Sequence, residues 1–350
     1  MYNCVKSFGV LPGGIEGKLY RIKNQAGIKV MISNVAAAIV SIFAPDRDGN
    51  CADIVLGYGC AKDYLSKGPY HGACIGRIAN RIENATFTLN GIVYHLPPNY
   101  QEKHVLHGGF YGLDSHVFDL VSHTKNSLCL ETVMEDGEDG FSGNVKLQVT
   151  YTIREDNGLS IRYYAVSDAD TVLNLTNHAY FNLAGEDSGC AMNQMLQIFS
   201  NEYLPLDEDG MVCGLVSPVD RVMDFRTGKP IIRDLDTGHP QIQIGNGYDH
   251  TYILKQDGKN LVFAARAIDE LSGRVMEVHT NMPSVLLYTG NFLGEHYVPG
   301  KNGRHYQNRE GFCLETGFYP NALRYPQFPQ PILRAGEIYD YETVYRFTNL

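Results

Sequence analysis

Two stretches of this 350-residue chain combine residue types that could move protons. The first is Asn177-His178-Ala179-Tyr180-Phe181-Asn182-Leu183, which places a histidine among amide and aromatic side chains at the end of an expected strand. The second is Gly311-Phe312-Cys313-Leu314-Glu315-Thr316-Gly317, which places one carboxylate inside an apolar run. An acid and a base without a cofactor motif nearby indicate proton transfer on a small polar substrate.

Glu315 and His178 suit that chemistry for different reasons. Phe312, Leu314 and Phe318 surround the carboxylate in the sequence, so desolvation is expected to raise its pKa towards the range of a base at neutral pH. A histidine can hold and release a proton near neutral pH. A purely structural role is the commoner outcome for an isolated histidine, whereas burying a carboxylate without a function is costly.

Further polar side chains could bind hydroxyl groups. Asn80 and Arg81 offer an amide and a forked guanidinium, and His107 precedes two glycines that let backbone approach a ligand closely. Tyr180 offers a flat ring, and Asp249 lies on the glycine-rich stretch 245–250. Three of these residues also have a purely structural interpretation: Arg81 in a structural salt bridge, and His107 and Asp249 in ordinary turns.

Composition excludes several classes of function. The net charge of -10 and the absence of a basic patch disfavour nucleic-acid or anionic-membrane binding. The N-terminus lacks the pattern of a secretory signal, and no apolar run is long enough to span a bilayer. Eight scattered cysteines without a Cys-x-x-Cys pair indicate free thiols in a reducing compartment, so we expect a cytoplasmic protein. Cys313 is expected to act as a small buried hydrophobe rather than a nucleophile.

An apolar–polar alternation of period two dominates the chain and predicts strands. Residues 145–153 and 159–165 alternate on either side of Asp156-Asn157-Gly158, and residues 86–89 and 92–96 flank Asn90-Gly91. Because Asn-Gly accepts positive φ angles, both predict tight hairpins. Further strands are predicted over 28–33, 128–133, 262–267, 274–280 and 285–289.

No long segment has a helical period, and no linker or compositional break divides the chain. These observations predict a single domain over residues 1–350, all-β, folded as one large antiparallel β-sandwich with few short helices. A Rossmann or barrel fold would need helical segments between the strands, and these are missing.

An ordered set of motifs resembles the aldose 1-epimerase (galactose mutarotase) family across nearly the whole chain. The set consists of Gly76-Arg77-Ile78-Ala79-Asn80-Arg81-Ile82, Leu106-His107-Gly108-Gly109, the His178 stretch, Tyr248-Asp249-His250, Tyr288-Thr289-Gly290-Asn291-Phe292 and the Glu315 stretch. The resemblance implies the galactose mutarotase-like supersandwich, no metal and no organic cofactor. It implies a small-molecule substrate, a free aldohexose such as D-galactose or D-glucose, and a monomer or weak homodimer.

The same resemblance implies roles for individual residues. Glu315 matches the general base that takes the proton of the anomeric hydroxyl, and His178 matches the general acid that protonates the ring oxygen. The opened aldehyde rotates about C1–C2 and recloses as the other anomer. Sugar-binding positions are matched by Asn80, Arg81, His107, Tyr180 and Asp249. Leu286 departs from the pattern, because many members carry a sugar-contacting glutamine there, so hexose preference or affinity is expected to differ.

Three rival hypotheses remain open at the level of sequence. A glycosidase would use two carboxylates, here Asp249 and Glu315, around a glycosidic bond. A non-catalytic sugar-binding or regulatory module on the same fold would bind a hexose and leave the anomerisation rate unchanged. A zinc site built from His107, His178 and Asp249 is disfavoured because no local pair such as His-x-x-x-His anchors it.

Overall fold

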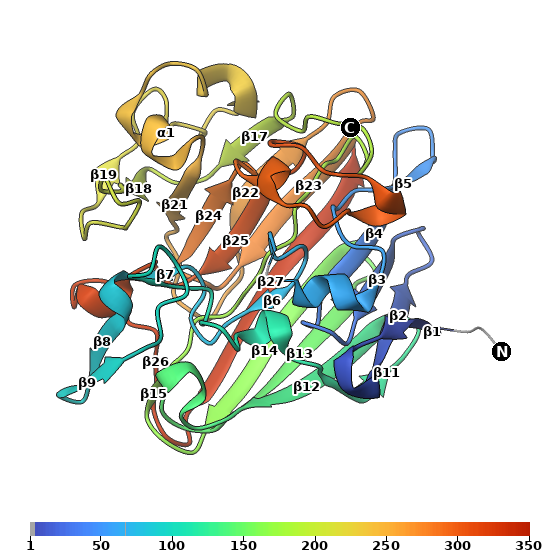
Figure 1. The fold of residues 1–350 in the computed structure, drawn as a ribbon. Coiled ribbons are helices and arrows are strands. Elements are labelled where there is room, and N and C mark those ends of the chain that lie inside the picture. Colours follow the sequence, from blue (N-terminus) through green and yellow to red (C-terminus); the bar gives the residue numbers. More distant parts are fainter. Residues whose placement is uncertain (1–3, 67) are drawn as a thin grey trace.

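Three antiparallel sheets form the body of the protein (Figure 1). The computed structural model describes residues 4–66 and 68–350, and strands predominate in it. The largest sheet has nine strands, which lie side by side in the order β11 (Asp119–His123), β12 (Ser127–Met134), β13 (Val145–Ile153), β14 (Gly158–Ser167), β27 (Ile338–Asn349), β23 (Arg274–Thr280), β22 (Val262–Ile268), β17 (Met195–Ile198) and β20 (Lys229–Pro230).

Two five-stranded sheets lie against this large sheet. The N-terminal one consists of β1 (Val5–Val10), β2 (Glu16–Lys23), β3 (Lys29–Ser33), β4 (Ile39–Pro45) and β5 (Cys51–Asp53). The other consists, in spatial order, of β19 (Ser217–Pro218), β18 (Glu202–Leu204), β21 (Asp249–Ile253), β24 (Ser284–Tyr288) and β25 (Cys313–Gly317).

Four two-stranded ladders and short helices complete the described part of the chain. The ladders are β6 (Cys74–Ile75) with β16 (Thr176–Asn177), β7 (Arg81–Ile82) with β10 (Val105–Leu106), β8 (Thr86–Leu89) with β9 (Ile92–His95), and β15 (Thr171–Val172) with β26 (Ile332–Leu333). The helices are α1 (Pro240–Gly245) and the 3₁₀ segments η1 (Pro12–Gly14), η2 (Ala61–Leu65), η3 (Glu83–Ala85), η4 (Leu113–Ser115), η5 (Glu138–Gly140), η6 (Ile231–Asp234), η7 (Leu293–Glu295), η8 (Lys301–Gly303) and η9 (Ala322–Arg324).

Side-chain alternation explains why these sheets stack. In β13, every second residue from Val145 to Ile153 is fully buried and the residues between are half-buried or exposed. The buried face joins apolar residues of both smaller sheets, such as Val30 and Val285, in one core cluster. Across the layers, the Tyr345 hydroxyl of β27 donates a hydrogen bond to the Leu314 carbonyl of β25. The predicted all-β sandwich with few short helices is therefore confirmed.

Both predicted hairpins are present, with turns of the expected chemistry. Asn157 has φ of 66° between β13 and β14, and Asn90 and Gly91 have φ of 52° and 77° between β8 and β9. The other predicted strands correspond to β3, β12, β22, β23 and β24, with ends that agree or shift by one residue. Among the helices described, none has the length and apolar character needed to cross a bilayer.

Candidate active site

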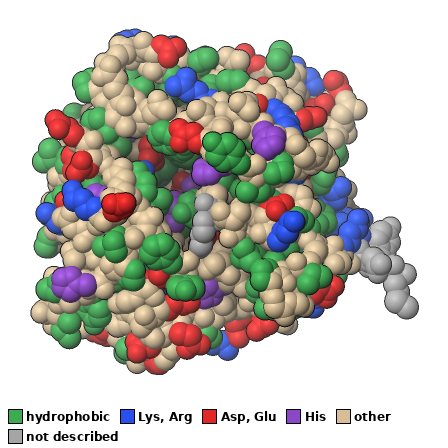
Figure 2. All heavy atoms as spheres, in the orientation of Figure 1, with side chains coloured by type: hydrophobic (Ala, Val, Ile, Leu, Met, Phe, Trp, Pro, Cys, Tyr) green, Lys and Arg blue, Asp and Glu red, His purple; other side chains and the backbone are tan. Residues whose placement is uncertain are grey.

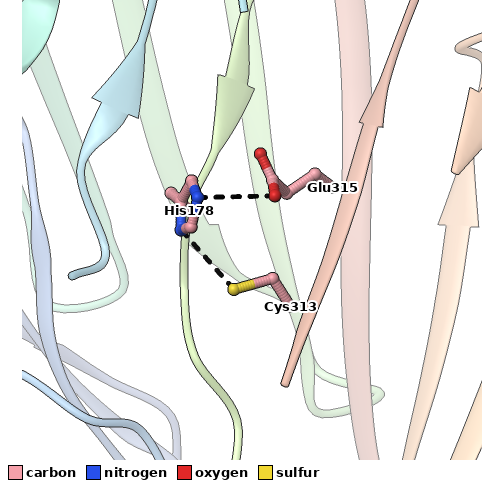
Figure 3. A group of neighbouring side chains, drawn as sticks. All are labelled: His178, Cys313 and Glu315. Carbon is pink, nitrogen blue, oxygen red and sulfur yellow. Dashed lines mark hydrogen bonds and ion pairs between the residues drawn. The ribbon is translucent and has the colours of Figure 1, made fainter. Parts of the chain in front are cut away.

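Strand β25 and the segment after β16 bring the two predicted proton-transfer residues together. Phe181 and Phe312 exchange two backbone hydrogen bonds, which lay residues 178–181 alongside the start of β25. His178 Nε2 then lies 3.5 Å from Glu315 Oε1, and Cys313 Sγ lies 3.5 Å from the other ring nitrogen, Nδ1 (Figure 3). The acid and base proposed from sequence therefore face each other directly.

The burial of Glu315 has a different origin from the one its sequence neighbours predicted. Successive strand residues point to opposite faces, so Leu314 lies on the far side of β25 from Glu315. Directly opposite Glu315 across the ladder is Leu286 of β24, and Thr251 of β21 follows in the same row. Leu286 is 6% exposed. Leu286, the residue that departs from the family pattern, thus lies beside the carboxylate and adds apolar surface without a hydrogen bond.

The shared burial shifts the pKa values of the pair in opposite directions. Desolvation raises the pKa of Glu315 to about 8; the Asp249 charge adds to this and Arg81 opposes it. Desolvation lowers the pKa of His178 to about 4, against the effects of its own backbone and of Asp249. The predicted rise for Glu315 is confirmed in direction. At neutral pH the pair therefore carries one transferable proton, whose resting place is the carboxyl group.

The short ladder of β7 and β10 positions three of the predicted sugar-binding residues. Arg81 pairs with Leu106, which places Asn80 and His107 beside each other just beyond the ladder. The Asn80 N–H donates to His107 Nδ1 at 3.2 Å. Burial lowers the pKa of His107 well below its usual range, so the ring is neutral and carries its proton on Nε2. His107 is thus a hydrogen-bond donor, and its ring lies 5.3 Å from that of His178.

Arg81 and Asp249 form an ion pair at the edge of the site. Arg81 Nη2 lies 3.1 Å from Asp249 Oδ2, and Asp249 opens β21 opposite Tyr288 of β24. Burial lowers the pKa of the Arg81 guanidinium. Asp249 and Tyr100 outweigh this effect and raise the pKa above its usual value. Arg81 Nε is buried without a hydrogen-bond partner. The structural salt bridge considered from sequence is present, and it joins two predicted binding residues.

Aromatic rings form one wall of the site. Tyr180 is buried, and its ring centroid lies 5.0 Å from that of His178 and 6.0 Å from that of Tyr288. Tyr70 lies 4.7 Å from His107 and 5.8 Å from His178, measured between ring centroids. The structure thus places Tyr180 where sequence predicted a flat apolar face.

Sequence reasoning missed Tyr70, Tyr288 and the contact of Cys313. Tyr288 could have been found, because it lies in one of the resembling motifs and shares a strand face with Leu286. Tyr70 adopts φ of 61°, a left-handed backbone that its sequence context does not signal. The Cys313 side chain points towards His178 because of how segments far apart in the chain pair with one another. No local sequence pattern reveals this contact.

All seven predicted site residues are gathered in one region, and the site is accessible. His107, His178, Tyr180 and Glu315 keep 2–8% exposure, while the side chains of Arg81 and Asp249 keep 16% and 13%. Figure 2 shows a hollow near the centre of one face, with histidine side chains visible inside it. Among the described residues, the potential metal ligands that cluster within 4.8 Å are His178, Cys313 and Glu315, not His107, His178 and Asp249.

The stacked sheets thus hold a buried histidine–glutamate pair that could move protons on a small polar substrate. The chain belongs to the aldose 1-epimerase family, whose model matches residues 18–346. It is 40% identical to galactose mutarotase from Homo sapiens and 39% identical to that from Rattus norvegicus, over 97% of both chains in each case. It is 36% identical to aldose 1-epimerase from Escherichia coli over 96% of both chains.

Solved structures agree with this assignment. An aldose epimerase homologue from C. elegans is 29% identical and superposes with a TM-score of 0.88, covering 95% of this chain and 99% of that one. A galactose 1-epimerase from Lactobacillus acidophilus is 27% identical, with a TM-score of 0.85 and coverage of 99% and 98%. The resemblance read from the motifs is therefore confirmed for the family and for the fold.

Proposed function

We propose that the protein is an aldose 1-epimerase of carbohydrate metabolism that interconverts the α and β anomers of free hexoses such as D-galactose and D-glucose. The contact between Glu315 and His178 carries this proposal. A hemiacetal bears its hydroxyl and its ring oxygen on the same carbon. An acid and a base only 3.5 Å apart can therefore reach both oxygens of one sugar at the same time.

In the proposed reaction, the anomeric hydroxyl of the sugar loses one proton and its ring oxygen gains one. The Glu315 carboxylate takes the proton of the anomeric hydroxyl, and His178 gives its Nε2 proton to the ring oxygen, which breaks the C1–O5 bond. Sugar hydroxyl groups that donate to the carboxylate favour its ionised form, which moves the shared proton onto His178. Rotation about C1–C2 exposes the other face of the aldehyde, and reclosure reverses both transfers.

The remaining residues are proposed to hold the hexose. Asn80, Arg81 and Asp249 offer donors and acceptors to vicinal hydroxyls, and Tyr180 packs against the ring. His107, with its proton on Nε2, would donate to the ring oxygen region and steady charge there. No step of this scheme requires a metal or an organic cofactor, so dialysis against EDTA is expected to leave the rate unchanged.

Polarimetry tests the proposed activity. Freshly dissolved α-D-galactose and α-D-glucose are followed with and without the protein, in a buffer of low general-base strength. A first-order rate above the blank that scales with protein concentration is expected for both sugars. A rate equal to the blank, with sugar still bound in calorimetry, would instead establish a binding module. Release of free galactose and glucose from lactose would point to a glycosidase.

We also propose that the protein works in the cytoplasm as a monomer or weak homodimer. All eight cysteines are free in the structure, in keeping with a reducing compartment. Sedimentation at several protein concentrations tests the oligomeric state. A stable tetramer would contradict it.

A further inference from the structure

Cys313, Glu315 and His178 bring three kinds of metal-binding side chain to one point in the site. Cys313 and Glu315 are two residues apart on β25, so both side chains leave the same face of the strand, and both point towards the ring of His178 (Figure 3). One ligand atom of each residue lies within 4.8 Å of the others, and all three residues are buried. The proposed sugar reaction uses Glu315 and His178 and leaves the thiol without a role.

The contact between Cys313 and His178 has the spacing of two zinc ligands. Sγ lies 3.5 Å from Nδ1. In a tetrahedral zinc site with bonds of about 2.3 Å to sulfur and about 2.0 Å to nitrogen, those two ligand atoms lie about 3.5 Å apart. The spacing to a carboxylate oxygen is similar, so a movement of about 1 Å brings Glu315 from its place near Nε2 into the same set of ligands.

The chemistry of the three side chains selects the kind of ion. Thiolate and imidazole groups bind Zn²⁺ well, whereas Mg²⁺ and Ca²⁺ prefer oxygen ligands alone. A thiolate and a carboxylate together offset the two positive charges of Zn²⁺, and a neutral imidazole adds none. A buried site can therefore hold the ion, because the complex has no net charge.

We propose that Cys313, His178 and Glu315 form an inhibitory binding site for Zn²⁺, with a water molecule as the fourth ligand. The ion displaces the protons of the thiol and of the carboxyl group, which leave to solvent. A carboxylate bound to zinc cannot take the proton of the anomeric hydroxyl. The inhibition rests on the proposed function of Glu315, whereas the binding of the ion does not. The ion is an inhibitor and not a cofactor, so the sugar reaction itself stays free of metal.

Calorimetry and optical spectroscopy test the binding without reference to turnover. The wild-type protein is titrated at neutral pH with Zn²⁺ and, separately, with Mg²⁺. We expect one tightly bound Zn²⁺ per chain and no binding of Mg²⁺. Titration with Co²⁺ in place of Zn²⁺ should produce a thiolate-to-cobalt charge-transfer band together with the visible bands of tetrahedral coordination.

Variants of the ligands assign the site. Loss of a residue that only supports a metal ligand typically weakens binding about 10–100-fold, so loss of a direct ligand in Cys313→Ala should weaken Zn²⁺ binding by at least about 100-fold. The same variant should lose the cobalt charge-transfer band. Glu315→Gln should also bind Zn²⁺ more weakly, because an amide is a poorer ligand than a carboxylate. Cys51→Ala and Cys190→Ala remove exposed thiols, serve as the matched controls and should bind as the wild type does.

Polarimetry tests the inhibition. Zn²⁺ at about ten times its wild-type Kd should occupy most of the wild-type protein and lower its rate by roughly tenfold, and excess EDTA should restore the rate. At the same Zn²⁺ concentration, Cys313→Ala should slow by less than about twofold relative to its own rate without metal, because little of it is occupied.

Three results would overturn the proposal. They are a wild-type protein that binds no Zn²⁺, a folded Cys313→Ala variant that binds Zn²⁺ as tightly as the wild type, and a zinc-loaded wild type that turns over sugar at its metal-free rate. If Cys313→Ala fails to fold, the cobalt spectrum of the wild type and the Zn²⁺ affinity of Glu315→Gln decide. A protein that does not speed anomerisation would refute the proposed function separately, and the metal titrations would still decide the site.

Discussion

At the residue scale, the site is a pair of groups whose burial pushes their pKa values apart. The pKa of Glu315 rises to about 8 and that of His178 falls to about 4, mainly by desolvation in both cases. Between these values the pair holds one proton, which is the state that can donate at one oxygen and accept at the other.

This pairing predicts a bell-shaped dependence of kcat/KM on pH. Below about pH 4 both groups of the free enzyme are protonated and no base remains; above about pH 8 the pair loses its proton and no acid remains. Polarimetric rates between pH 3.5 and 9.5, corrected for the buffer, should show a plateau between the two limbs. A rate that still rises through pH 9 would contradict the shared-proton account.

Leu286 gives a second prediction at this scale. It lies opposite Glu315 in the ladder and beside Thr251, whose buried hydroxyl lacks a hydrogen-bond partner. Leu286→Gln adds a donor and an acceptor facing the site, so it should lower KM for galactose while kcat changes less than about twofold. Leu286→Met keeps the apolar surface and serves as the control. Equal KM values in both variants would mean that position 286 does not reach the sugar.

Residue types and their order were sufficient to predict which side chains form the site, but not how they touch. Glu315, His178, Asn80, Arg81, His107, Tyr180 and Asp249 were all named from sequence, and the structure brings them together. Their roles stay proposals. The Cys313 contact was not predicted, because buried cysteine usually only packs. The apolar neighbours of Glu315 were misassigned, because Leu314 points away from it along the strand.

At the element scale, local turn chemistry determined which strands could be predicted. Asn157 and Asn90 adopt positive φ and close hairpins whose register follows directly from the sequence. The two-residue ladders β6–β16 and β7–β10 were not predicted. They are too short for an alternating pattern, and their pairing joins residues far apart in the chain. These ladders nevertheless position His178, His107 and Arg81.

The turn that carries His107 depends on Gly108, and this predicts a position-specific loss of stability. Gly108 has φ of 89°, and a Cβ there would lie 2.0 Å from the Gly76 carbonyl oxygen. Gly108→Ala should therefore displace His107, lower the melting temperature and raise KM. Gly91→Ala, at φ of 77° with nothing within 4 Å, carries only the backbone strain and should cost about 1–2 kcal/mol. An equal loss in both variants would show that the close approach to Gly76 is unimportant.

At the scale of the whole molecule, one core cluster runs from Tyr20 to Phe347 and includes residues of all three large sheets. That residues 1–350 form a single domain stays a prediction, and a shared core is the reason to expect it. Calorimetry should give one cooperative transition, and limited proteolysis should leave no stable fragment. Two transitions, or a resistant fragment containing only one of the five-stranded sheets, would contradict a single domain.

The most direct test of the central claim is the polarimetric turnover of Glu315→Gln and His178→Asn on α-D-galactose. Glu315→Gln keeps the size of the side chain, His178→Asn shortens it to a smaller polar amide, and both remove the ability to transfer the proton. Each positioned proton-transfer group contributes about 10²–10⁴-fold, so kcat should fall by at least about 100-fold in each variant while circular dichroism matches the wild type. A folded variant that retains near-normal turnover would contradict the proton shuttle between Glu315 and His178.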